Sequence, residues 1–129
     1  MKVYPVYLLI FILLGFNSCK DKCDSGFGGG VTFKIKPMHH SLHIKGGIVK
    51  VKFDSNNFPG DNDNNYDILR KINNNDSILV LEGLKCGDYY LYATGFDSTI
   101  NAEVKGGLPY RTSTEEGTIE LIIPVTEPH

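Results

Sequence analysis

No stretch of this 129-residue chain carries a convincing 3.6-residue apolar repeat, so a helical fold is not expected. An excess of positive charge is lacking as well, and the formal net charge of −2 argues against nucleic acid or an anionic membrane surface as a partner. No serine lies in a glycine-flanked nucleophile context, Cys86 has no evident histidine partner, and the carboxylates are scattered over polar segments. We therefore expect neither an enzyme nor a cofactor.

One apolar run is too short to cross a bilayer. Residues 3–16 are almost wholly apolar, and Lys2 places a positive charge before them. A membrane-spanning helix needs roughly 20 residues. The length and the flanking charge are those of the apolar region of a signal peptide.

The segment after this run contains a small residue directly before a cysteine. Residues 15–19 read Gly-Phe-Asn-Ser-Cys. This segment resembles the lipobox of bacterial lipoproteins, although Asn17 is not the preferred residue at its position. The resemblance implies that residues 1–18 are removed and that Cys19 is lipidated. The protein would then be exported and anchored to a membrane of the bacterial cell envelope, with the outer membrane or cell surface favoured. The alternatives are an ordinary secretory signal and an uncut N-terminal anchor.

Three cysteines are an odd number, and lipidation of Cys19 would leave two. Cys23 and Cys86 are then either a disulfide pair or two unpaired thiols. Residues 19–30 are polar and glycine-rich, which predicts a flexible tether before a folded domain over residues 31–127. Without Lys2 the net charge becomes −3.

Three segments of the domain alternate apolar and polar residues, as strands with one buried face do. The alternating sets are Val31, Phe33 and Ile35; Val49, Val51 and Phe53; and Ile119, Leu121, Ile123 and Val125. Residues 78–81 and 88–96 predict two more strands, and residues 66–72 and 102–111 two weaker ones. Turn signals separate them at short intervals, so we predict an all-β fold, an antiparallel sandwich of about seven strands.

A short motif within this pattern resembles a known family. Leu84, Gly87, Tyr89, Leu91 and Ala93 fill the pattern L-x-x-G-x-Y-x-L-x-A. It is similar to prealbumin-like (transthyretin-like) domains, including carboxypeptidase regulatory-like and Cna-B-type modules. The resemblance implies a Greek-key, immunoglobulin-like sandwich over about residues 30–126, as in some small lipoproteins, and it marks a fold rather than an activity.

One enzyme shares that fold, 5-hydroxyisourate hydrolase, which ends in Tyr-Arg-Gly-Ser. Residues 110–113 read Tyr-Arg-Thr-Ser, without the glycine, and a further strand follows. The motif therefore does not extend the resemblance to this enzyme.

Two segments contain residues that bind metals. His39, His40 and His43 are imidazole ligands for Zn²⁺ or Cu²⁺, with His39 and His43 on one side of an extended chain and Asp54 or Glu82 completing a site. Oxygen ligands for Ca²⁺ alternate in a loop at Asp61, Asp63, Asn65 and Asp67. The alternatives are polar residues at a strand end and a solvated turn.

Tyr90, Tyr92 and Tyr110 are candidates for the face opposite the core, where aromatic rings stack on sugars or anchor a protein. Cross-strand pairing that stabilises the sheet is the alternative. We therefore expect a non-catalytic lipoprotein of the cell envelope that acts as a binding or structural accessory module for a protein or glycan partner. The second hypothesis is a metal-binding lipoprotein.

Overall fold

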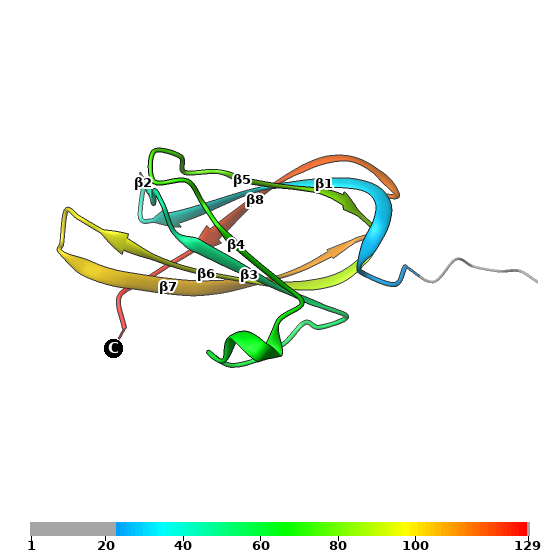
Figure 1. Ribbon diagram of the computed structural model, residues 1–129, viewed down its shortest axis with the longest axis horizontal. Helices are drawn as coiled ribbons and strands as arrows, with labels where there is room; N and C mark the ends of the chain where they lie inside the picture. Colours follow the sequence, from blue (N-terminus) through cyan, green and yellow to red (C-terminus); the bar gives the residue numbers. More distant parts are fainter. Residues whose placement is uncertain (1–22, 129) are drawn as a thin grey trace, which may run out of the picture.

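The computed structural model describes residues 23–128, which form two β-sheets packed face to face (Figure 1). The predicted all-β sandwich is confirmed. The elements are β1 (Phe27–His39), β2 (Leu42–His43), β3 (Ile48–Phe53), the 3₁₀ turn η1 (Asp63–Asn65), β4 (Ile68–Lys71), β5 (Leu79–Leu84), β6 (Gly87–Asp97), β7 (Ala102–Thr112) and β8 (Glu116–Pro124). Cys19 and the predicted signal peptide lie outside the described residues. Within the described part, no helix is long and apolar enough to cross a membrane.

The first sheet is built around β1. β5 pairs with β1 antiparallel, and β2 forms a short hairpin with its last residues. β8 pairs with β1 in parallel, from Gly30 opposite Glu116 to Met38 opposite Pro124. The antiparallel expectation therefore fails for this one pair of the described strands. Because β1 and β8 are not neighbours in the chain, no hairpin turn dictates their relative direction.

The second sheet has the order β4-β3-β6-β7, with all three pairs antiparallel. Alternate residues of both sheets meet in the core between them, as the period-two pattern predicts. In the L-x-x-G-x-Y-x-L-x-A motif, Leu84, Tyr89, Leu91 and Ala93 are all fully buried, and Gly87 has a φ of 140° that disfavours other residues.

Residues 23–30, the part of the predicted tether that the structure describes, belong to the folded domain. β1 begins at Phe27, four residues before the first alternating position, and a disulfide joins Cys23 to Cys86. Gly29 packs so closely on β5 that a Cβ atom there would overlap the carbonyl of Leu84. Glycine is thus required where β1 and β5 approach each other, although the same residue weakens the sequence signal for a strand.

Candidate functional site

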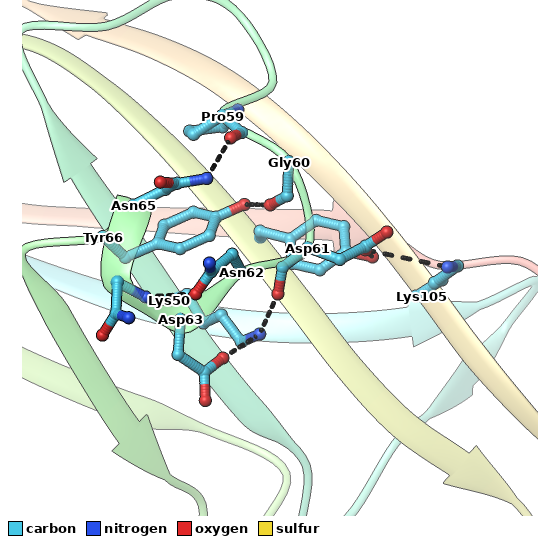
Figure 2. Close-up of polar contacts among 11 residues, drawn as sticks. Lys50, Pro59, Gly60, Asp61, Asn62, Asp63, Asn65, Tyr66 and Lys105 are labelled. Carbon is cyan, nitrogen blue, oxygen red and sulfur yellow. Dashed lines mark hydrogen bonds and ion pairs between the residues drawn. The ribbon is translucent and has the colours of Figure 1, made fainter.

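The loop over residues 54–67 folds back across the outer face of the second sheet (Figure 2). Tyr90 and Tyr92 alternate with the core residues of β6 and so face this loop. From the loop, the ring of Tyr66 stacks on that of Tyr92 at 6.2 Å, and both are buried. The outer face of this sheet therefore has a second, smaller cluster of packed side chains.

Lys50 is the charged centre of that cluster. Its ammonium lies 5.6 Å from the centroid of the Tyr66 ring and 5.7 Å from that of Tyr92. It donates a hydrogen bond to the carbonyl of Asp61 at 3.3 Å and pairs with the carboxylate of Asp63 at 2.5 Å (Figure 2). Two aromatic faces and a carboxylate compensate the buried ammonium and fix the loop on the sheet.

The structure does not bring the four predicted calcium ligands together. Asp61 accepts a hydrogen bond from the Tyr92 hydroxyl at 2.9 Å, whereas Asp63 pairs with Lys50. Asp67 accepts from the amide of Phe53, and Asn65 donates to the carbonyl of Pro59. The expected alternation fails because residues 63–65 form a 3₁₀ turn, which has about three residues per turn and therefore separates every second side chain.

Burial and nearby negative charge raise the pKa values of Tyr66 in the loop and Tyr92 on β6. Burial first, then the neighbouring Tyr90 and the carboxylates of Asp61 and Asp63, raises the pKa of Tyr66 to about 12. Burial, followed by the hydrogen bond to Asp61, raises the pKa of Tyr92 as well. Both hydroxyls are therefore neutral at physiological pH. The Tyr66 hydroxyl donates to the carbonyl of Gly60 at 2.7 Å (Figure 2).

A recess of about 380 Å³ opens beside this loop, and we call it the aromatic recess. Phe58 lies at its edge, 49% exposed, with its ring 6.0 Å from Tyr90 and 5.0 Å from Tyr92. Asp61 and Lys105, whose charged atoms are 3.7 Å apart, provide polar groups in the same wall. Sequence patterns did not single out Phe58, because it lies in an irregular loop.

Gly107 makes room for the ring of Tyr90, which lines this recess. It lies opposite Tyr92 on β7, and a Cβ atom there would collide with the hydroxyl end of Tyr90. The Tyr90 ring can therefore lie across the backbone of β7 instead of standing away from the sheet.

Tyr110 does not belong to this surface. It lies opposite Tyr89 in the register of β6 and β7, and residues that face each other across two strands share one side of the sheet. Its ring packs edge-on against Phe33 at 5.8 Å, next to the core. The expectation that Tyr110 joins Tyr90 and Tyr92 is therefore wrong.

The chain matches no protein-family model, no curated protein and no solved structure. The arrangement of its own residues is therefore the basis for any functional conclusion.

The predicted histidine cluster lies at the end of the sandwich where β1 and β6 finish. His39 continues the inward-facing row of Phe33 and Ile35, and Asp97 continues that of Tyr89 and Leu91 on β6. Both are almost fully buried, and Nδ1 of His39 lies 2.6 Å from Oδ2 of Asp97. The inward-facing residues of β1 and β6 thus end in His39 and Asp97, which contact each other between the two sheets.

Hydrogen bonds keep Asp97 ionised. The Thr99 hydroxyl, 2.6 Å from Oδ1, and then His39 hold the pKa of Asp97 at about 2. In return, the hydrogen bond to Asp97, with the charge of Glu127, raises the pKa of His39. An ionised Asp97 accepts from Nδ1, so that nitrogen carries a proton and Nε2 points the other way.

Glu127 reaches this cluster from the C-terminal segment. After β8, the amide of Val125 donates to the carbonyl of Met38, and Thr126 bridges to Lys105 on β7. This path places Oε2 of Glu127 3.3 Å from Nε2 of His39. The acid that groups with His39 and His40 as a potential metal ligand is therefore Glu127, and not Asp54 or Glu82, which are outside this group.

His43 does not share the site. The hairpin between β1 and β2 places His43 opposite Met38 and Leu42 opposite His39, so His43 takes the side opposite to His39. His40 instead comes next to His39, with ring centroids 4.3 Å apart. The sequence expectation assumed an extended chain through residues 39–43, which the turn at His40 reverses.

Proposed function

We propose that this protein is a non-catalytic lipoprotein of the bacterial cell envelope that binds a glycan in its aromatic recess. The observation that carries the proposal is the half-exposed Phe58 ring held over Tyr90 and Tyr92, beside the charged groups of Asp61 and Lys105. The apolar face of a sugar ring stacks on aromatic side chains, and its hydroxyls need charged or polar partners at the edge.

The dimensions of the recess favour a sugar over a protein partner. A volume of about 380 Å³ accommodates one or two sugar units. A stable protein partner would cover about 800 Å² of this surface, which is far more than the mouth of one small recess. The ion pairs of Lys50 and Lys105 hold the loop in place, so the aromatic wall is formed before a ligand arrives.

The proposed location on the cell envelope is consistent with glycan binding. A prealbumin-like sandwich held at Cys19 by two or three acyl chains would stay on its membrane and meet the glycans of the envelope. The sandwich itself is the part of this description that the structure shows.

Binding of the purified mature lipoprotein to an array of neutral and acidic oligosaccharides tests the recess. We expect one glycan class to bind, and Phe58→Ala to weaken that binding about tenfold, because removal of one stacking ring costs roughly 1.4 kcal/mol. Titration calorimetry with the best-bound oligosaccharide measures the loss.

Phe96→Ala is the matched control, because Phe96 is 54% exposed but does not line the recess. We expect its affinity for the oligosaccharide to equal that of the wild type. An equal loss in both variants, or no bound glycan, would refute the proposal.

The anchor has a separate test. Mass spectrometry of the protein from its own envelope should find an acylated Cys19 at the N-terminus, without residues 1–18. Cys19→Ala should remove the lipid and move the protein out of the membrane fraction, whereas Cys23→Ala, four residues away, should keep the lipid. An unacylated chain that retains its first residues would contradict the anchor.

A further inference from the structure

We propose that His39, His40 and Glu127 form a binding site for a divalent transition-metal ion of the Zn²⁺ type, with Asp97 as the residue that positions His39. This site does not require glycan binding, although Glu127 also lines the aromatic recess. The three ligand atoms lie within 4.8 Å of one another. They come from the end of β1, the following turn and the C-terminal segment, which the fold brings to one place.

The buried Nε2 atom of His39 is the first reason for the proposal. His39 is only 3% exposed, and its Nε2 atom has no hydrogen-bond partner among the described residues. Nε2 faces the Glu127 carboxylate at 3.3 Å as an ion pair, and a buried polar atom without a hydrogen bond is costly in native proteins. A metal ion at this position would satisfy it.

The distance to Glu127 is the second reason. Two ligands of a tetrahedral Zn²⁺ ion, each about 2.0–2.1 Å from the metal, lie about 3.3 Å apart. The Nε2 atom of His39 and the Oε2 atom of Glu127 are 3.3 Å apart and form an ion pair when His39 is protonated. One ion can therefore bind both atoms with little rearrangement.

Asp97 supplies the partner that metal-bound histidines usually have. Its Oδ2 atom lies 2.6 Å from Nδ1 of His39, and its Oδ1 atom accepts from the amide and hydroxyl of Thr99. Both oxygens are thus occupied, so Asp97 orients the imidazole and directs Nε2 to the metal without binding the metal itself. With Glu127, it also balances the two positive charges of the ion.

His40 completes a set of three protein ligands. It has a positive φ of 54°, and this conformation turns the chain so that its ring lies beside that of His39. Two imidazoles and a carboxylate favour Zn²⁺ over Ca²⁺ or Mg²⁺, which prefer oxygen ligands. A recess of about 400 Å³ borders all three residues and leaves a fourth position open to water or an anion.

Titration calorimetry with ZnCl₂ tests the site, with the mature lipoprotein purified without a histidine tag. We expect saturable binding of one ion per chain, and a melting temperature that rises with Zn²⁺ and falls back with a chelator. Asp97→Asn should lower the affinity for Zn²⁺ about 10- to 100-fold, as the loss of an orienting partner does. His39→Ala and Glu127→Gln should lower it further.

Two comparisons separate this site from weak surface binding. His43→Ala is the control, since His43 is exposed and lies outside the cluster, and its affinity should equal that of the wild type. Glu127→Gln is nearly isosteric and near the C-terminus, so its fold should persist even if His39→Ala does not fold.

With Co²⁺ as the probe, the wild type should give the intense visible bands of tetrahedral coordination, and Glu127→Gln should weaken them. The proposal is overturned if the wild type does not bind Zn²⁺ even at millimolar concentration, or if His43→Ala loses as much affinity as Glu127→Gln.

Discussion

Replacing Cys23 and Cys86 together by serine is expected to lower the free energy of unfolding by about 4 kcal/mol. The disulfide spans 63 residues, so it removes much of the freedom of the unfolded chain. It also holds the first residues of the domain against the turn between β5 and β6, where the Lys85 amide donates to the carbonyl of Gly26 at 2.8 Å. Since small domains are stable by only about 5–15 kcal/mol, a large part of the stability is at stake.

Urea denaturation of the oxidised wild type and the double variant measures this difference. Ser25→Ala is the matched control. It removes both hydrogen bonds of the Ser25 hydroxyl, the one donated to the Asp54 carboxylate at 2.9 Å and the one accepted from the Asp54 amide, but keeps the covalent link. We expect it to cost only about 1 kcal/mol. A double variant that loses no more than Ser25→Ala would show that the hydrogen bonds hold this end of the domain without the disulfide.

The strands could be predicted from the sequence because each has one buried and one exposed face. The alternation at Val31, Phe33 and Ile35 depends only on that local fact, and these residues are all fully buried in β1. The start of β1 could not be predicted in this way. Gly28 to Gly30 have no side chains to alternate. Phe27 and Val31 both lie opposite Leu84 of β5, so the glycines form a bulge in that pair, and Gly30 pairs with Glu116 of β8.

The sites were harder to predict, because they depend on contacts between distant segments. Alternation along β1 and β6 could have placed His39 and Asp97 on the core side of their strands. The contact between His39 and Asp97, however, depends on how the two sheets are stacked. The approach of Glu127 depends on the bridge between Lys105 and Thr126, for which the sequence has no signal. Histidine spacing alone therefore suggested His43 as a ligand in place of Glu127.

The loop over the second sheet illustrates a different limit. Its Asp and Asn residues suggested a cation site because oxygen atoms recur at every second position. In the structure, these carboxylates instead form ion pairs with lysines of β3 and β7: Lys50 pairs with Asp63, and Lys105 with Asp61. Cross-strand positions decide this pairing, and the loop composition alone does not reveal them.

Phe33→Ala is expected to destabilise the domain by about 3–5 kcal/mol, the usual cost of removing a large aromatic side chain from a core. Phe33 is fully buried, and its ring packs edge-on against Tyr89 at 5.1 Å and Tyr110 at 5.8 Å. The variant leaves a cavity between the two sheets, since the paired strands on both sides cannot close it by moving independently. Urea denaturation measures the loss, and Phe96→Ala, which removes an exposed ring, should stay within about 0.5 kcal/mol of the wild type. If Phe33→Ala were equally mild, the two sheets would not share the core through which His39 and Asp97 are brought together.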